Sequence, residues 1–283
     1  MPTARRAPTS SPGTSPARVP DPDPTVDVTR PPFPPVEPAG ASPLWAGYLR
    51  AGLESAEGAP REVGEVVGVG GRLDPSSVLT AYRHGVFPMG LGEGGSPPMG
   101  WWSPTWRGVL RPGHVHISRS LRRSLRAFTV TVDEDFEAVL SACADPSREG
   151  YWITDDVAAA YTELHALGWA HSVEVRDDTG SLVGGLYGIA VGGLFAGESM
   201  FHHATDASKA AVVALDRLVG ADRDPRRIID VQWRTPHLET LGIEEIHRRE
   251  YLARLAGALQ APPLDLGAAL AVSDPLRSGP ESL

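Results

Sequence analysis

The sequence predicts an α+β fold, in which a small N-terminal α/β domain is followed by a larger domain of alternating strands and helices. Two observations lead to this prediction. Residues 33–150 mix turn-rich segments with short helical segments, whereas residues 151–259 have a regular rhythm of apolar strands and amphipathic helices. Such alternation is typical of a sheet with helices packed against it.

The two ends of the chain have compositions that predict little order. Thirteen of the 27 prolines lie in the first 43 residues, and residues 1–32 contain few large apolar side chains. Such a segment buries too little surface to offset the entropy of ordering it, so we expect a disordered proline-rich arm. Residues 260–283 contain four more prolines, and we expect them to form a flexible tail.

The elements of the first domain, residues 33–150, follow from local signals. Residues 76–84 are predicted to be helical, because Pro75 suits the first turn of a helix and Gly85 suits its end. Residues 88–98 are rich in glycine and proline and predict turns. Apolar spacing predicts three further elements, which are helices over 118–127 and 135–144 and a strand over 129–132.

The second domain, residues 151–259, has the clearer pattern. Its predicted elements are a helix over 155–167, strands over 171–176, 182–183 and 193–195, a helix over 208–219, a strand over 228–233 and a helix over 244–259. The order hairpin, strand, helix, strand, helix is compatible with an acetyltransferase-like fold. The order of elements does not by itself establish that fold.

Charge and cysteine content limit the classes of function. The net charge of −9 gives no overall attraction for nucleic acid, so an RNA site must be a local basic patch. The single cysteine, Cys143, excludes an internal disulfide and a metal site built from several cysteines. It fits a reducing compartment, and we expect a cytoplasmic protein. No run of eighteen apolar residues occurs, so no membrane span is expected.

One basic segment interrupts this acidic sequence. No Asp or Glu occurs between Glu93 and Asp133, and the same stretch contains six arginines. Four arginines have the spacing of one helical face, namely Arg119, Arg122, Arg123 and Arg126. Uncompensated guanidinium groups suit phosphate binding, which makes this face a candidate RNA-binding surface. The alternative is a solvated helix face that carboxylates from elsewhere in the fold neutralise.

Tryptophans beside this segment offer surfaces for stacking. Trp101 and Trp102 precede it in the chain, and Trp152 follows it. Exposed tryptophans near arginines can stack on unpaired bases, such as those at the 3′ end of a tRNA. Buried tryptophans are more common in proteins, so a place in the core is the alternative.

The segment Gly-Glu-Ser-Met-Phe at residues 197–201 contains a candidate pocket. It is not a hydrolase nucleophile elbow, because Phe201 stands where the second glycine is required. In an extended strand Glu198 and Met200 lie on one face. A carboxylate beside a thioether can line a pocket that takes an amine and an apolar side chain. The alternative is a strand end with an exposed glutamate.

Two polar residues share a face of the strand predicted over 228–233. Asp230 and Gln232 lie about 7 Å apart by the rise of a strand, while Ile229, Val231 and Trp233 take the other face. Polar groups on a short strand inside a domain must find partners or serve a function. The alternative is an edge strand with its polar side in water, and the pattern itself favours neither.

These segments, in this order, resemble the leucyl/phenylalanyl-tRNA–protein transferase family over roughly residues 33–259. The matching segments are residues 70–73, 81–88, 101–104, 116–120, 152–154, 170–175, 183–188, 197–201, 207–209, 229–232, 237–238 and 241–242. So many motifs in the correct order make a chance match improbable.

The resemblance implies a tRNA-binding N-terminal domain beside an acetyltransferase-like catalytic domain. It implies transfer of leucine or phenylalanine, or also methionine, from leucyl-tRNA or phenylalanyl-tRNA to a protein that begins with Arg or Lys. That protein would thereby be marked for degradation. Because the aminoacyl ester is already activated, the reaction would need no ATP, no cofactor and no metal. The resemblance further assigns catalysis to Asp230 and Gln232, and the substrate site to Trp152, Glu198 and Met200.

The chemistry of these residue types suggests how they would act. The side-chain oxygen of Gln232 could accept a hydrogen bond from the attacking amine, with Asp230 positioning the amide. Glu198 could pair with the cationic first residue of the acceptor. Phe195 and Ile229, together with Met200, could form an apolar pocket for the leucyl or phenylalanyl side chain.

The sequence departs from the family pattern at four positions. Arg72 stands where the family usually has Asp, Met89 where it has Trp, and His202 and His203 where it has Ser-Arg. Met89 weakens the case for stacking at that position, and the histidines change the groups near the substrate. No His, Cys or carboxylate at helical ligand spacing accompanies the two histidines, so we expect no zinc site.

Two other functions fit parts of the sequence. An acyl-CoA-dependent N-acetyltransferase would need a glycine-rich pyrophosphate loop before the helix over 208–219, and residues 201–207 contain no glycine. A non-catalytic tRNA-binding module would use the arginine face. It would leave Asp230, Gln232 and Glu198 without a role.

Overall fold

The computed structural model describes residues 65–148, 150–272 and 274–277. Its strands are β1 (Val66–Val69), β2 (Phe87–Gly90), β3 (Met99–Trp102), β4 (Trp106–Leu110), β5 (Thr129–Val132), β6 (Ala170–Arg176), β7 (Leu182–Val191), β8 (Leu194–His202), β9 (Ile228–Gln232) and β10 (Glu244–His247). Its α-helices are α2 (Pro75–Arg83), α3 (Arg119–Ser124), α4 (Phe136–Cys143), α5 (Asp155–Ala166), α6 (Ala207–Val219), α7 (Pro236–Glu239), α8 (Arg248–Ala258) and α9 (Leu266–Val272). The arm predicted over residues 1–32 lies outside the described residues.

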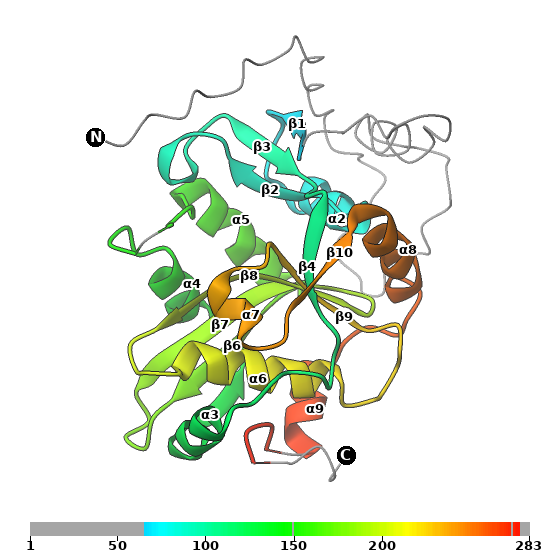
Figure 1. Cartoon of the computed structure of the whole chain (residues 1–283). Helices are drawn as coiled ribbons and strands as arrows, with labels where there is room; N and C mark the ends of the chain where they lie inside the picture. The colour runs from blue at the N-terminus through cyan, green and yellow to red at the C-terminus, as the bar shows by residue number, and fades with distance from the viewer. Residues whose placement is uncertain (1–64, 149, 273, 278–283) are drawn as a thin grey trace, which may run out of the picture.

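The described strands form two sheets (Figure 1). A three-stranded antiparallel sheet has the order β1-β3-β2, and a seven-stranded sheet has the order β10-β4-β9-β8-β7-β6-β5. In the large sheet only β8 and β9 run parallel, and α6 connects them. A parallel pair needs such a crossover connection. The protein is therefore a mixed α/β fold with one large mixed sheet.

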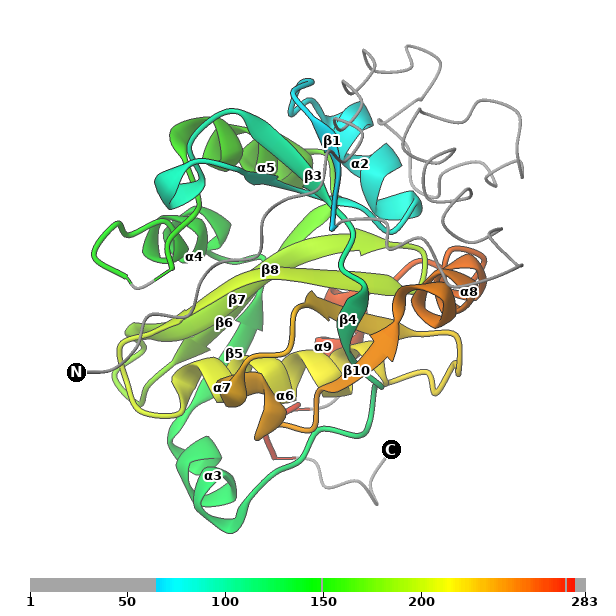
Figure 2. The ribbon, with the colours of Figure 1, turned by 45° about the horizontal axis from the view of Figure 1, so that its top comes forward.

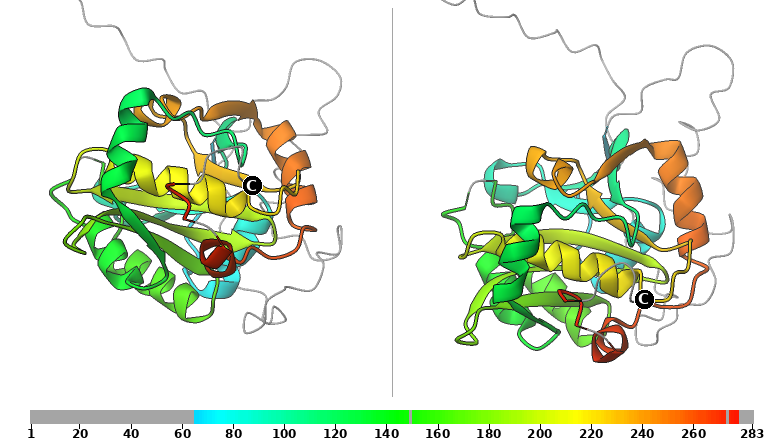
Figure 3. Two further views of the ribbon diagram at one scale, coloured as in Figure 1. Left: turned by 90° about the horizontal axis from the view of Figure 1, so that it is seen from below. Right: turned by 60° about the horizontal axis from the view of Figure 1, so that its bottom comes forward.

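Helices cover both faces of the large sheet (Figures 2 and 3). On one face α6 packs beside α9, and the core there includes Phe195, Val213 and Ile229. On the other face α4 and α5 pack with a core that includes Tyr161 and Tyr187. Because side chains alternate along a strand, β7 and β8 contribute to both cores.

Two helices that contribute to this second core, α2 and α5, begin at well-formed caps. At α2, the side chain of Asp74 accepts a hydrogen bond from the Ser77 nitrogen at 3.0 Å, directly before Pro75. At α5, Thr154 accepts one from the Val157 nitrogen at 3.4 Å. Such caps satisfy backbone donors that have no partner within the helix. They confirm the helices predicted over 76–84 and 155–167.

The domain boundary predicted at residue 150 does not divide the fold. β4 and β5 precede residue 150, yet they pair with β9, β10 and β6 in the large sheet. The small sheet ends at Trp102 and the large sheet begins at Trp106. Strand pairing is non-local, so the apolar period within each strand did not reveal which sheet it joins.

The C-terminal segment is packed rather than flexible where the structure describes it. α9 contacts α6 and β5, and Leu266 and Leu276 are buried. The prediction of a loose tail over 260–283 is therefore wrong for residues 260–272 and 274–277. Its prolines suggested disorder, but its leucines cover an apolar surface on α6.

Two predicted helices have different bounds. The helix expected over 118–127 ends as α3 at Ser124 and continues as a 3₁₀ turn over Leu125–Ala127. The helix expected over 244–259 starts only at Arg248, because residues 244–247 form β10 and pair with β4. Within the described ranges, no helix has the length and apolarity needed to span a membrane.

Candidate active site

The end of β9 places two polar side chains inside the protein. Asp230 is fully buried, and Gln232 is 7% exposed. Both face away from α6, whereas Ile229 and Val231 pack against the α6 core. β9 lies between β4 and β8, so the alternative of a solvated edge strand is excluded. The predicted alternation of Asp230 and Gln232 with their apolar neighbours is confirmed.

Asp230 is held by four hydrogen bonds. Its two carboxylate oxygens accept from Nε and Nη2 of Arg107, at 2.8 and 2.6 Å. Tyr251 donates its hydroxyl at 2.8 Å, and the backbone nitrogen of Gln232 donates at 2.9 Å. With both oxygens occupied, the carboxylate has a single orientation.

Arg107 forms the buried partner of this carboxylate. Its side chain is 1% exposed, and Nη1 donates to the carbonyl of Gly85 at 3.1 Å. Its guanidinium lies over the rings of Phe87 and Tyr251, 4.8 and 4.6 Å from their centroids. Burial lowers the pKa of Arg107, but the Asp230 carboxylate outweighs burial and raises it overall. A buried ion pair is retained only when further contacts satisfy both partners, as they do here.

Gln232 ends β9 in a left-handed backbone conformation, with φ at 59°. Residues other than glycine rarely adopt this conformation. Its side-chain nitrogen Nε2 is buried and has no hydrogen-bond partner within the described residues. A buried donor without a partner costs free energy, and such groups are concentrated at functional sites.

The turn at Gln232 also redirects the next side chain. Trp233 was predicted to share a face with Ile229. Instead its ring packs edge-on against Phe87 and Trp102, with centroid distances of 5.1 and 5.8 Å. The prediction for Trp233 is wrong because the strand ends one residue earlier than expected.

Glu198, which is partly exposed, lies at the centre of a second hydrogen-bonded cluster. Tyr82 donates to its Oε1 at 2.6 Å and Tyr161 to its Oε2 at 3.0 Å, and the two hydroxyl oxygens are 2.8 Å apart. Burial raises the pKa of both tyrosines well above the usual value, so they stay protonated as donors. α2 and α5 thus hold the carboxylate from one side of the sheet.

The environment of Glu198 makes it a titrating group near neutral pH. Burial raises its pKa, the two tyrosine hydrogen bonds lower it, and the net effect is a pKa of about 7. The charge of Asp230 raises this pKa, and that of Arg107 lowers it. The two clusters therefore lie within electrostatic reach of each other and form one site.

Glu198 and Met200 do not share a face, contrary to the prediction. The β7–β8 register shifts so that Gly188 pairs with Gly197 and Tyr187 with Ser199, which leaves Glu198 unpaired. Such an irregularity re-aims the inserted side chain. Glu198 points to the tyrosines, while Met200 packs with the α6 core.

The predicted apolar pocket belongs mostly to the core. Phe195 and Ile229 are at most 1% exposed and pack beneath α6. Met200 is partly exposed and packs against the same core. Within this group, only Met200 presents a surface that a substrate could contact.

The three tryptophans predicted to contact substrate also differ in their exposure. Trp101 is fully buried, and its ring nitrogen donates to the carbonyl of Gly70 at 2.7 Å. It is a core residue, and the prediction that it contacts substrate is wrong. Trp102 donates to the carbonyl of Met89 at 2.8 Å and is partly buried, as is Trp152.

The four arginines predicted to bind RNA lie on the surface. Arg119, Arg122 and Arg123 are exposed on α3, and Arg126 is exposed on the following 3₁₀ turn. Within the described ranges no carboxylate forms an ion pair with any of them. Neutralisation by described carboxylates, the alternative reading of this face, is therefore not observed.

Several site residues had escaped the sequence-based assignment. They are Tyr82, Arg107, Tyr161 and Tyr251, which come from four different elements. A signal was available for Arg107, since it is a charged residue in the otherwise apolar strand β4. Among the described residues, no group of three or more His, Cys, Asp or Glu is placed to hold a metal ion.

The chain matches two family models. Residues 71–105 match the leucyl/phenylalanyl-tRNA protein transferase N-terminal domain, and residues 109–256 match the leucyl/phenylalanyl-tRNA protein transferase model. Among solved structures, the chain is similar to L-PGS from Bacillus licheniformis, with a TM-score of 0.33 and 11% identity over 56% of this chain and 50% of that one.

Curated relatives that carry the name of this family match most of the chain. The leucyl/phenylalanyl-tRNA–protein transferase of Solidesulfovibrio magneticus is 48% identical over 202 residues, which span 70% of this chain and 79% of the relative. That of Chromohalobacter salexigens is 48% identical over 223 residues, which span 77% and 84%. With its site geometry, its two family matches and these relatives, the chain belongs to the leucyl/phenylalanyl-tRNA–protein transferase family.

Proposed function

We propose that Gln232, positioned by Asp230 and Arg107, carries the reaction of this transferase, and that Glu198 selects the acceptor. The enzyme transfers leucine or phenylalanine from aminoacyl-tRNA to a protein N-terminus. The observation that carries the proposal is the buried side-chain nitrogen of Gln232, which lies beside a fixed carboxylate and has no hydrogen-bond partner among the described residues.

The reaction is the attack of a neutral α-amine on the aminoacyl ester. A carbon–nitrogen bond forms, the bond to the ribose oxygen of the tRNA breaks, and the proton lost by nitrogen ends on that oxygen. The oxygen of the Gln232 amide accepts a hydrogen bond from the amine. Its nitrogen is then free to donate to the ester oxygen, on which negative charge develops. Because the ester is already activated, no ATP and no cofactor is required.

Asp230 acts by positioning. Four donors occupy its oxygens, one of which is the backbone nitrogen of Gln232. A carboxylate held in this way fixes the backbone of the glutamine. Preorganised orientation is a large source of rate acceleration, because the cost of ordering is met during folding.

Glu198 supports selection of an acceptor that begins with Arg or Lys. Glu198 is partly exposed, and hydrogen bonds from two tyrosines hold its carboxylate in a fixed orientation. Because the pKa of Glu198 is about 7, a nearby cation favours the charged form of this carboxyl group. A guanidinium or ammonium group on the first residue of the acceptor would supply that cation.

Three further groups are proposed to hold the donor. Met200 contacts the leucyl or phenylalanyl side chain, since its flexible thioether adapts to both shapes, with Phe195 and Ile229 buried behind it. Trp102 and Trp152, both partly exposed, stack with the 3′ end of the tRNA. The exposed arginines 119, 122, 123 and 126 bind its phosphates.

Two broader assignments accompany this function. We propose that the large sheet has an acetyltransferase-like arrangement, which the β8–α6–β9 crossover supports. We also propose that the product is a degradation signal formed in the cytoplasm. An acceptor with a cationic first residue would then begin with leucine or phenylalanine after transfer.

The direct test uses the protein with radiolabelled leucyl-tRNA, without ATP or acetyl-CoA. Two acceptors that differ only in their first residue, Arg or Gln, are compared. We expect label at the N-terminus of the Arg-starting protein only. Equal labelling of both acceptors would contradict the role of Glu198, and no labelling of either would contradict the proposed donor and acceptor.

A further inference from the structure

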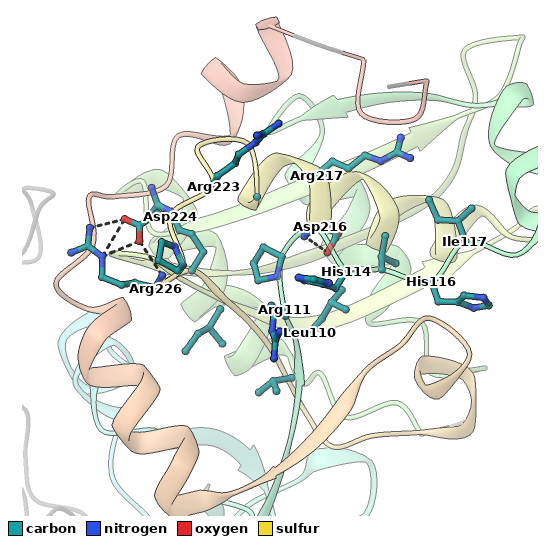
Figure 4. A pocket seen from close by; sticks show the side chains of 18 of the residues that line it. Leu110, Arg111, His114, His116, Ile117, Asp216, Arg217, Arg223, Asp224 and Arg226 are labelled. Carbon is teal, nitrogen blue, oxygen red and sulfur yellow. Dashed lines mark hydrogen bonds and ion pairs between the residues drawn. The ribbon is translucent and has the colours of Figure 1, made fainter. Parts of the chain in front are cut away.

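A large groove lies at the Ile228 end of β9, whereas Gln232 is at the other end of this strand. Figure 4 shows side chains that line the groove. Its volume is about 1640 Å³, and it is lined by the end of β4, the segment before α3, the C-terminal half of α6, the loop before β9 and one side of α8. Two of its lining residues, Arg122 and Arg126, belong to the arginine surface proposed above to bind tRNA, and the rest of the groove has no role in that proposal.

The groove is strongly basic in a protein whose net charge is −9. Nine arginines line it, and the lining carboxylates are Asp216 and Asp224. The arginines are Arg111, Arg122, Arg126, Arg217, Arg223, Arg226, Arg227, Arg254 and Arg277. Such local concentration of one charge creates a field that attracts anions, whatever the overall charge of the protein.

Four of these arginines already have ion-pair partners. Arg226 pairs with Asp224 at 2.6 Å, Arg227 with Asp222 at 2.5 Å, Arg254 with Glu250 at 2.5 Å and Arg277 with Asp274 at 3.0 Å. Of the remaining five, Arg217 donates to the carbonyl of Pro275. Arg111, Arg122, Arg126 and Arg223 are exposed and form no ion pair with any described carboxylate. They come from three separate segments around one hollow.

Contacts between α6 and the segment that follows β4 hold the wall of the groove in place. Asp216, which is 1% exposed on α6, accepts a hydrogen bond from the backbone nitrogen of Gly113 at 2.9 Å. At Gly220 a β-carbon would lie 3.2 Å from that same nitrogen, so the segment packs closely on the end of α6. These contacts fix the backbone that follows Arg111 against the helix that leads to Arg223 (Figure 4).

We propose that this groove binds the phosphate backbone of the donor tRNA within its double-stranded part, away from the aminoacylated 3′ end. The proposal rests on the function proposed above. Unpaired guanidinium groups are the usual partners of backbone phosphates, and double-stranded RNA is recognised mainly through its shape and its phosphates. Several arginines that pair with no described carboxylate lie in three segments, and this spread suits an extended polyanion better than one compact phosphate.

The position of the groove agrees with this occupant. β4 carries Arg107 at the catalytic end and Val109 and Leu110 at the groove. Three residues of strand span about 10 Å. Arg122 and Arg126 belong both to the groove and to the arginine surface beside α3. The groove therefore extends that surface past α3 toward the loop before β9, along which an RNA backbone could continue.

The test is the binding of uncharged leucine-specific tRNA at several salt concentrations by the full chain and by R111Q/R223Q. We expect the Kd of this variant to rise roughly tenfold at low salt, and its salt slope to fall by about one for each arginine removed. The matched control is R72Q/R176Q, which removes two charges from outside the groove. We expect this control to keep the wild-type Kd and the wild-type dependence of Kd on salt. An unchanged slope in R111Q/R223Q, or an equal loss in both variants, would overturn the proposal.

Two more measurements separate this site from the catalytic proposal. Hydroxyl-radical footprinting should show duplex nucleotides that are protected by the wild type and exposed with R111Q/R223Q, while the 3′ end stays protected. Loss at the 3′ end alone would overturn the groove assignment. Transfer from leucyl-adenosine, which carries no RNA backbone, should be equal in the wild type and the variant. If the wild type transfers from neither donor, the proposed function is wrong. The tRNA-binding data still test independently whether the groove binds RNA.

Discussion

Arg107 and Asp230 form a two-point ion pair that is almost completely buried, with nitrogen–oxygen distances of 2.8 and 2.6 Å. The two residues lie 123 positions apart in the sequence, on the neighbouring strands β4 and β9. Asp230 in turn binds the backbone nitrogen of Gln232. The ion pair thus controls the geometry of the residue proposed to contact the reacting amine.

Arg107→Lys should lower kcat by about tenfold or more, because an ammonium group cannot reproduce the planar two-point contact. The charge remains, so the protein should still fold. Removing the charge with Arg107→Met should instead destabilise the protein by about 3–5 kcal/mol, since it leaves a buried carboxylate unpaired. Single-turnover rates and melting curves check the two outcomes. A wild-type kcat for Arg107→Lys would show that the orientation of Asp230 does not matter.

Gln232→Ala should lower kcat and kcat/KM together by about a hundredfold, with little change in KM, as for a group that acts in the transition state. Gln232→Glu should be similarly impaired, because it adds a charge near Asp230. The double variant with Asp230→Asn should be little worse than either single variant, since residues that act as a unit are not additive. Single-turnover transfer at saturating tRNA and acceptor measures this. Folded variants that transfer at the normal rate would remove the pair from the mechanism.

Acceptor selection should depend on pH through Glu198. Its pKa of about 7 means that it is neutral in acid and charged in mild base. The ratio of kcat/KM for Arg-starting over Gln-starting peptides should therefore rise with pH through about 7. The ratio cancels the titration of the attacking amine, which both peptides share. Glu198→Gln should give a low and flat ratio. A pH-dependent ratio in this variant would assign the selection to another group.

The same titration affects stability. The pKa of Glu198 is raised in the folded state above its ordinary value of 4.5. A carboxyl group whose pKa is raised on folding contributes to the free energy of unfolding. That contribution is fully present below pH 4.5 and is lost as the pH rises through about 7. Glu198→Gln should remove that loss, so its Tm should vary less with pH across this window. A parallel Tm profile for both proteins would contradict the raised pKa.

Replacing Arg119, Arg122, Arg123 and Arg126 with Gln should raise KM for aminoacyl-tRNA and flatten its dependence on salt, because fewer counterions are released on binding. The kcat at saturating tRNA should hardly change, since these arginines lie on the surface. Initial rates over a range of tRNA and salt concentrations provide the measurement. An unaltered salt slope would mean that tRNA does not contact this face.

Met200→Ala tests the donor pocket. Loss of the thioether should change discrimination between donors by about 1–3 kcal/mol. Leucine should suffer more than phenylalanine, because the smaller side chain fills the enlarged space less well. The ratio of kcat/KM for leucyl-tRNA over phenylalanyl-tRNA is the readout. A fixed ratio in a folded variant would place Met200 outside the pocket.

The sequence by itself determined the features that depend on near neighbours in the chain. The caps at Asp74 and Thr154 start helices where predicted. The period of two along residues 228–232 placed Asp230 and Gln232 on one face of a strand. The ordered motifs identified the family, which the matches to its models confirm. Each of these signals lies within a few residues of the feature that it predicts, so the linear pattern was sufficient.

Only the tertiary structure decided which residues meet. Tyr82 and Glu198 are 116 positions apart, and Arg107 reaches across 123 positions to Asp230. The register shift beside Glu198 turned its side chain away from the face of Met200. The basic groove joins arginines from segments that no periodicity connects. Apolar spacing reports how one element buries its own face, whereas ion pairs, strand register and grooves depend on partners that folding brings from distant parts of the chain.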